Sequence, residues 1–326
     1  MEKKLARVRI RYIKRPQIYI LTAAVIVVCL IVLGYIVWCK TSVFLTRSWR
    51  TNVVLKSDPP VIVSLPKNRE DKIILLSLPA DTYTKVPYGY GEYQLLAVWR
   101  LGELEKKPRL YLDTLEDALA LKLAGWVGEG ALKPVAGGDD FVASIKATLT
   151  PIKVVLGQVG GNLSFPDQLF LAYKHATAGA GNFDLAETQN IPLVFQTQEL
   201  PDGTQVKEIN DSVADKYLSP KFEETEVRRE SLSVEVRNTT QIPGLGQKFA
   251  RFISQIGGKV VTVGNESDKI SGCRLHLRVD MLKNTLVKYL QREFDCQPDT
   301  IGYQGNGELD IYLGPPFGHR WEVKNN

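Results

Sequence analysis

The first candidate for a functional site is a loop over residues 238–246, where an alternating apolar run gives way to a helical pattern. The candidate ligand-binding residues in it are Asn238, Thr239, Gly244 and Gly246. A helix N-terminus attracts anions, so this loop could bind phosphate. A Pro-Gly turn between a strand and a helix needs no ligand, however, and plain turn chemistry is the simpler interpretation.

Cys273 and Cys296 form a candidate disulfide in the last part of the chain. The first would open a strand and the second would follow a helix packed on the same sheet. A bridge would close a loop of about 24 residues and stabilise the fold by roughly 3 kcal/mol. Two buried free thiols are the alternative. Cys29 and Cys39 lie in or at an apolar run, where inert packing is expected.

Other sequence signals for catalysis are absent. The histidines, His175, His276 and His319, are scattered along the chain, so no metal cluster is expected. Neither a Gly-x-Ser-x-Gly elbow nor a Walker loop occurs. We therefore expect no metal and no cofactor from the motifs alone.

The element that must hold any outer site in place is an apolar run over residues 18–38, which contains no charged residue. At about 1.5 Å per residue it crosses a hydrocarbon core of roughly 30 Å. Tyr19, Tyr35 and Trp38 lie near its ends, where aromatic side chains favour the interface. A buried core helix or a cleaved signal peptide fits this length and its flanks less well. We predict an uncleaved signal anchor with its membrane helix over residues 18–39.

The flanking charge predicts the orientation. Residues 1–17 form a basic tail with seven Lys and Arg against Glu2, and positive residues stay cytoplasmic. The net charge of +5 belongs to this anchor, because residues 41–326 hold 33 basic and 35 acidic side chains. The basic balance is therefore no argument for nucleic acid. We expect a single-pass protein of the cell membrane with its C-terminal domains outside the cytoplasm.

The next part of the chain reads as an α/β domain. Short β-branched runs predict strands over residues 52–55, 60–65 and 72–78, the last two joined as a hairpin. A loop rich in Gly and aromatic residues follows. Helices are expected over residues 93–105 and 114–124. A later helix would run toward Lys174, capped by Asn162 or Ser164.

The run IILLSLPADTYTKVPYGYGEYQLLAVWRLGEL, together with KSDPPVIVSLPKN before it and Asn-Leu-Ser at residues 162–164, resembles the LytR–CpsA–Psr domain. The resemblance spans roughly residues 50–200. It implies transfer of lipid-pyrophosphate-linked glycopolymers onto peptidoglycan with a divalent metal such as Mg²⁺, held by carboxylates. Asp58 and Asp81 would be the weak catalytic candidates.

The sequence departs from that family where pyrophosphate would bind. Ala80 stands at the motif's arginine position, Pro59 replaces a threonine, and no arginine lies between residues 130 and 162. An alanine cannot replace a guanidinium fork that holds a dianion. Asp58 and Asp81 are then better explained as turn-forming acids on an inherited scaffold, as in a pseudoenzyme.

The charged, Pro-containing stretch that follows predicts an exposed linker over residues 201–230. Beyond it, apolar alternation and helical periodicity predict the order β-α-β-β-α-β over residues 231–318, a small layer with helices on one face. The run VEVRNTTQIPGLGQKFARFISQIGGKVVTVGN closely resembles the LytR C-terminal domain. That resemblance implies an envelope context and no reaction.

Together these features predict a membrane helix, a shortened α/β LytR–CpsA–Psr-like domain and a small C-terminal domain. We expect a non-catalytic binding or scaffold module in cell-wall assembly. Its expected partners are the membrane and peptidoglycan, wall glycopolymer or wall-assembly proteins. A divergent glycopolymer transferase is the alternative. The sequence leaves open the ligand, the oligomeric state and the bridging of Cys273 and Cys296.

Overall fold

The computed structural model describes residues 15–68, 71–79, 81–128, 133–134, 140–188, 191, 194–199, 203–267, 270–303, 308–315, 318 and 320. The chain divides into two compact units, Met1–Thr46 and Arg47–Asn326.

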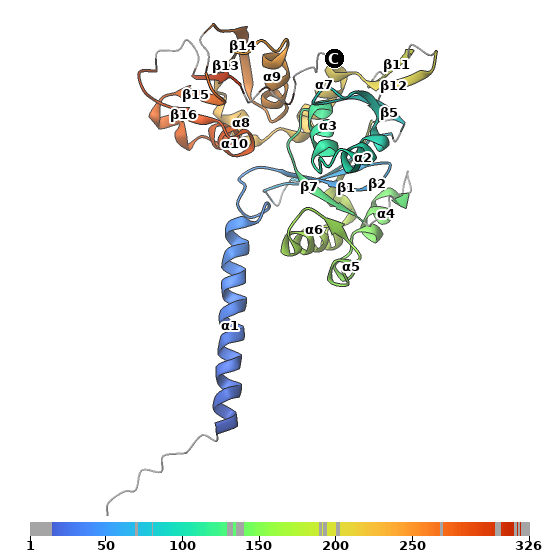
Figure 1. Cartoon of the computed structure of the whole chain (residues 1–326), viewed down its shortest axis with the longest axis vertical. Coiled ribbons are helices and arrows are strands. Elements are labelled where there is room, and N and C mark those ends of the chain that lie inside the picture. The colour runs from blue at the N-terminus through green and yellow to red at the C-terminus, as the bar shows by residue number, and fades with distance from the viewer. Residues whose placement is uncertain are drawn as a thin grey trace, which may run out of the picture. The chain divides into compact units, whose positions relative to one another are not determined.

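The first unit holds one long helix, α1 (Arg15–Thr41), drawn in blue in Figure 1. Its stretch Tyr19–Thr41 is long and apolar enough to cross a membrane, and none of it is buried inside the protein. The N-terminal helix expected from the apolar run is therefore present. Its orientation in a membrane stays a prediction.

The second unit is built around a six-stranded sheet in the order β10-β4-β3-β1-β7-β9. These strands are β1 (Thr51–Leu55), β3 (Val61–Leu65), β4 (Ile73–Ser77), β7 (Leu123–Gly128), β9 (Gly160–Gly161) and β10 (Phe183–Glu187). β3 runs antiparallel to β1 and β4, which confirms the expected hairpin, while β7 is parallel to β1. All residues of β1, β3 and β4 are buried, as expected of strands covered on both faces.

Helices cover the two faces of this sheet. Figure 1 shows α2 (Leu95–Leu104) and α3 (Leu110–Leu119) on one side, and α5 (Pro151–Val155) and α6 (Phe165–Thr177) on the other. α4 (Phe141–Thr148) precedes α5, and a short 3₁₀ helix (Ala180–Asn182) precedes β10. Ser164 caps α6 by accepting a hydrogen bond from the Asp167 amide at 3.3 Å. The other candidate cap, Asn162, instead accepts from the Trp126 amide through Oδ1 at 2.7 Å.

A second sheet lies in the same unit, in the order β11-β12-β5-β6. It comprises β5 (Thr82–Val86), β6 (Gly91–Gln94), β11 (Phe195–Glu199) and β12 (Gln205–Ile209), and a small pair joins β2 (Ser57–Asp58) to β8 (Lys133–Pro134). The aromatic stretch expected as a loop is therefore a hairpin. Its turn uses positive φ angles at Tyr88, Gly89 and Gly91, which glycine adopts at no steric cost.

The helix expected over residues 114–124 is wrong in its bounds. α3 begins at Leu110 and ends at Leu119, with Ala120 as its C-cap at φ +52°, and β7 already begins at Leu123. The apolar leucines of this stretch serve two elements. Leu115 and Leu119 pack from the helix, whereas Leu123 pairs with Asn52 of β1.

In the described part of residues 201–230, regular secondary structure stands in place of the expected exposed linker. β12 is followed by α7 (Asp211–Phe222) and α8 (Thr225–Glu230). Leu218, Phe222 and Val227 are buried. The charges that suggested a solvated stretch form ion pairs, with the Arg251 Nε 2.6 Å from Asp215.

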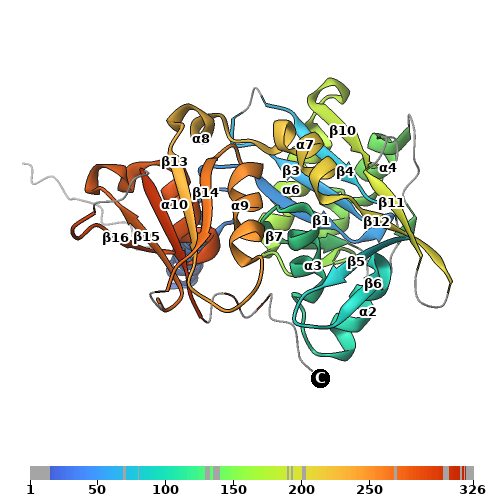
Figure 2. The same ribbon diagram turned by 90° about the horizontal axis from the view of Figure 1, so that it is seen from above.

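The C-terminal part forms a five-stranded sheet in the order β14-β13-β17-β15-β16. Its elements are β13 (Ser233–Asn238), α9 (Leu245–Gln255), β14 (Lys259–Asn265), β15 (Cys273–Leu277), a 3₁₀ helix (Val279–Lys283), α10 (Thr285–Phe294), β16 (Gln297–Asp299) and β17 (Leu309–Leu313). Alternate strand residues such as Val234 and Val236 share one core with α9 and α10. Phe249 of α9 meets Phe294 of α10 with ring centroids 4.8 Å apart, so both helices pack on one face. The expected order occurs, with β16 as an addition; Figure 2 shows these elements from above.

Candidate functional site

Asp58 and Asp81, the two acids singled out by the sequence, leave the central sheet at the same edge. The Leu78 amide donates to the Pro60 carbonyl at 3.2 Å, so the chain enters and leaves the β3–β4 hairpin side by side there. Asp58 ends β2, and Asp81 comes just before β5. β1 and β4 both run antiparallel to β3, so their carboxyl ends lie on the same side of the central sheet. Asp58 follows the first of these strands and Asp81 follows the second.

Aromatic side chains and Lys56 lie at this edge. The Lys56 ammonium lies 4.0 Å from the centroid of Trp99 and 5.5 Å from that of Trp126. Trp99 also packs edge-on against Tyr111, with centroids 5.0 Å apart. Burial, and then the nearby Asp58 carboxylate, raise the pKa of Tyr111. A lysine ammonium is a point charge, so Lys56 does not replace the planar, bidentate fork of an arginine.

The partners of the two acids do not match a metal or pyrophosphate site. The exposed Asp81 carboxylate pairs with the Lys207 ammonium at 3.0 Å. Among the described residues, no arginine forms an ion pair with Asp58 or Asp81, and no group of three or more His, Cys, Asp or Glu could hold a metal ion. Ala80 lies outside the described residues. The divalent metal implied by the family resemblance therefore does not fit the described side chains, and no step is derived through it.

The loop over residues 238–246 uses its polar side chains internally. Asn238 Oδ1 accepts from the Thr240 amide at 3.0 Å, and Asn238 Nδ2 donates to the Ile242 carbonyl at 3.0 Å. The Thr239 hydroxyl donates to the Leu313 carbonyl at 3.0 Å. These bonds suit the turn interpretation. Ligand binding by this loop stays a prediction.

The two glycines of that loop have separate roles. Gly244 is the N-cap of α9 at φ +73°, a backbone conformation that favours glycine. A side chain at Gly246 would lie 2.9 Å from Val263, so glycine lets α9 approach β14.

Cys273 and Cys296 form a disulfide that joins β15 to the segment after α10. His175 lies in helix α6 and His276 in strand β15, far apart in the sequence, while His319 lies outside the described residues. The scattered histidines thus stay separate in the described structure.

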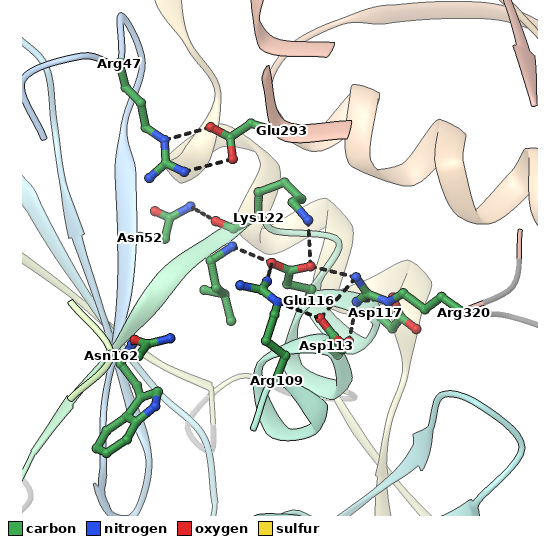
Figure 3. Close-up of polar contacts among 12 residues, drawn as sticks. Arg47, Asn52, Arg109, Asp113, Glu116, Asp117, Lys122, Asn162, Glu293 and Arg320 are labelled. Carbon is green, nitrogen blue, oxygen red and sulfur yellow. Dashed lines mark hydrogen bonds and ion pairs between the residues drawn. The ribbon is translucent and has the colours of Figure 1, made fainter. Parts of the chain in front are cut away.

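A cavity of about 840 Å³ lies at the opposite edge of the central sheet, where the sequence predicted nothing. β1 and β7 run parallel, and Lys122, which lines the cavity, immediately precedes β7, whereas Asp58 follows the carboxyl end of β1. Six cationic side chains line it: Arg47, Lys106, Lys107, Arg109, Lys122 and Arg320. We call this the basic cavity; its polar contacts are drawn in Figure 3.

Glu116 of α3 is fully buried behind the basic cavity and anchors three of these cations (Figure 3). Its carboxylate accepts from the Lys122 ammonium at 2.8 Å and from Arg320 Nη1 at 2.7 Å, with Arg109 Nη2 at 3.4 Å. Burial would raise the pKa of Glu116, but Lys122 and Arg320 outweigh burial and lower that pKa to about 2. Glu116 is therefore a permanent anion that fixes the cavity wall.

The remaining wall is held by further pairs. Arg47 donates to both oxygens of Glu293, at 2.7 and 3.0 Å. The Tyr88 hydroxyl donates to Asp113 Oδ2 at 2.9 Å, and burial, then Asp113, raise the pKa of Tyr88. Such bidentate and charge-assisted contacts give a rigid wall.

Sequence reasoning missed the basic cavity because its members are far apart along the chain. Arg47 precedes β1, and Arg320 follows the last strand. The one local signal is the run Glu-Lys-Lys-Pro-Arg over residues 105–109, which supplies three of the six cations.

The described chain is thus a mixed α/β protein with several sheets and one N-terminal apolar helix. No protein-family model and no curated protein matches its sequence. Among solved structures, similarity is found to Bacillus subtilis TagV, at 10% identity over 52% of this chain and 95% of that chain, and to B. subtilis TagU, at 13% identity over 55% and 99%. A transcriptional regulator from Enterococcus faecalis matches at 11% identity over 66% and 90%.

The TM-score is 0.36 in each of these comparisons. A TM-score of this size with identities of 10–13% does not assign this chain to a family.

Proposed function

We propose that this chain is a single-pass, membrane-anchored protein of the cell envelope, whose outer part binds wall polymer or wall-assembly proteins without transferring glycan. The apolar helix α1 and the sequence resemblance of residues 50–200 and 231–318 support the envelope location. A basic tail before α1 supports an outer C-terminal part.

One observation carries the non-catalytic half of the proposal. Among the described side chains at the sheet edge that holds Asp58 and Asp81, Lys56 is stacked on Trp99 and Lys207 is paired with Asp81. Breaking a pyrophosphate bond requires preorganised charge against the dianion, and removing one such contact typically costs about 10²–10³ in rate. With several arginines missing, the loss exceeds what a single residue can restore.

The test uses the full chain in neutral detergent, incubated with lipid-pyrophosphate-linked glycan, a peptidoglycan acceptor and Mg²⁺ or Mn²⁺. We expect neither phosphate release nor glycan transfer, and Ala80→Arg alone should not restore either. In parallel, the full chain should co-sediment with purified wall.

Transferase activity is the competing function, and Asp58 and Asp81 at one edge are what favours it. Metal-dependent turnover that both Asp58→Ala and Asp81→Ala abolish would establish that function and overturn ours. Absence of turnover together with absence of wall co-sedimentation would leave the binding proposal without its main support.

A further inference from the structure

The basic cavity lies opposite the sheet edge that holds Asp58 and Asp81, so the proposed function does not involve it. We propose that the basic cavity binds a phosphate group of a small anionic ligand. The inference rests on the charge balance of the cavity, its rigid inner wall and its size.

The inner wall of the basic cavity is close to neutral and already paired. Arg47, Lys122 and Arg320 have side chains only 12%, 16% and 14% exposed, and each contacts a carboxylate within 3 Å. Their partners are Glu293, Glu116, Asp113 and Asp117. These buried pairs set the shape of the cavity and leave its rim to supply any excess charge.

The rim carries three further cations that are weakly compensated. The Arg109 side chain is 50% exposed and reaches Asp113 and Glu116 only at 3.5 and 3.4 Å. Lys106 and Lys107 have no ion pair within 4 Å among the described residues. The six lining cations thus exceed the four carboxylates in and behind the wall by two charges.

Lys107 is also held in place at this rim. Its ammonium lies 4.8 Å from the centroid of Tyr88 and 4.9 Å from that of Tyr90. The two tyrosine hydroxyls are in turn bonded to Asp113 and Glu105. A cation fixed by aromatic rings loses less freedom when it meets an anion, and this favours binding.

Phosphate fits this excess better than carboxylate does. A phosphate monoester carries about −1.5 to −2 charges near pH 7, whereas a carboxylate carries one. Arg109 offers a planar fork for two oxygens, and the two lysines offer point charges, a combination suited to several phosphate oxygens. The volume of about 840 Å³ lies within the usual range of small-ligand sites.

The phosphate could belong to a free small molecule or to a lipid headgroup, and the experiment separates these sources. The full chain in neutral detergent is titrated calorimetrically with inorganic pyrophosphate, with citrate as a carboxylate probe, and with vesicles of phosphatidylglycerol or of phosphatidylcholine. We expect saturable one-to-one binding of pyrophosphate that is tighter than that of citrate. Binding of phosphatidylglycerol vesicles that pyrophosphate displaces would identify a lipid source.

The variant Lys106→Gln, Lys107→Gln, Arg109→Gln should weaken pyrophosphate binding by at least about tenfold. The matched control is Lys67→Gln, Arg100→Gln, Lys259→Gln, which removes the same charge from exposed positions elsewhere. The control should change binding by less than about twofold, since general electrostatic attraction is screened over a Debye length of about 10 Å.

A second measurement does not depend on any variant. Lysine acetylation of the unmodified chain, read by mass spectrometry with and without pyrophosphate, should show protection of Lys106 and Lys107 and none of Lys67 or Lys259. The proposal is overturned by the absence of saturable binding, by equal losses in the two triple variants, or by protection spread evenly over all lysines.

Discussion

Glu116 and His175 are both fully buried ionisable side chains, but the fold keeps Glu116 ionised and His175 neutral. Glu116 is surrounded by Lys122, Arg320 and Arg109, so it stays ionised. Neither ring nitrogen of His175 has a hydrogen-bond partner among the described residues, and the ring packs edge-on against Phe183 at 5.2 Å. Burial, and then the nearby Lys146, lower the pKa of His175 to about 4.

This lowered pKa makes the stability of the protein depend on pH. The unfolded chain takes up a proton at His175 near pH 6.5, while the folded chain does so only near pH 4. Stability is therefore full above pH 6.5 and falls as the pH drops through this window, by up to about 3 kcal/mol from this residue. In His175→Leu we expect a shallower fall between pH 7 and pH 4, measured as thermal midpoints of both proteins across that range. A parallel pH profile in the two proteins would contradict the assignment.

At the scale of elements, α3 is held to the end of the described chain by one guanidinium. Arg320 pairs with Glu116 at 2.7 Å and with Asp117 at 2.6 Å, and its carbonyl accepts from the Tyr88 amide at 3.0 Å. Burial raises the pKa of Asp117 to about 6, although Arg320 and Lys248 oppose that shift. Two buried acids on one helix therefore depend on a side chain from outside it.

Arg320→Ala should lower the free energy of unfolding by roughly 3–5 kcal/mol, because it leaves buried carboxylates without their main counter-charge. The measurement is denaturant unfolding of the full chain in neutral detergent, followed by tryptophan fluorescence. Arg229→Ala is the matched control, since that side chain is 69% exposed and pairs only with Glu226, itself 54% exposed. The control should cost less than about 1 kcal/mol. Equal losses in the two variants would show that the buried pairs contribute nothing special.

The disulfide between Cys273 and Cys296 closes a loop of sequence separation 23 beside α10. Cys273→Ser with Cys296→Ser should reduce the free energy of unfolding by roughly 3 kcal/mol. Thiol counting on the unfolded, non-reduced chain checks the bridge directly. Two reactive thiols are expected, from Cys29 and Cys39, and a count of four would exclude the bridge.

The elements that sequence reasoning located well are those with clear local patterns. Leu245, Phe249 and Ile253 recur on one helical face, and Leu275 and Leu277 alternate along a strand, so α9 and β15 could be predicted. α7 was missed although Ala214, Leu218 and Phe222 recur every four residues on its buried face, because the charged residues and Pro220 around them suggested a solvated linker. Some of those charges instead form ion pairs with Arg251.

The same contrast holds for the candidate sites, because the two acids could be found from the sequence and the basic cavity could not. Asp58 and Asp81 could be singled out because they stand at acidic positions of the motif that residues 50–200 resemble. Arg47 and Arg320 line the same cavity only in the folded protein, so no local pattern marks them.

For the whole molecule, the charge next to the apolar helix predicts on which side of a membrane the second unit lies. A reporter fused after Asn326 should lie outside the cytoplasm, because the positive charge of residues 1–17 keeps the opposite end inside. The same reporter fused before Met1 should give a cytoplasmic signal. A cytoplasmic signal from the fusion at Asn326 would contradict the proposed compartment and the wall-binding role with it.

The pair between Glu116 and Arg320 spans 204 residues. A chain is synthesised from its amino end and, if exported as we propose, also emerges on the outer face in that order. Glu116 then lacks its contact with Arg320 until residue 320 has crossed, while Lys122 and Arg109 are available much earlier. The amino-terminal core is therefore made early but lacks this ion pair until residue 320 has been exported. Its full stability then requires export of the chain that far.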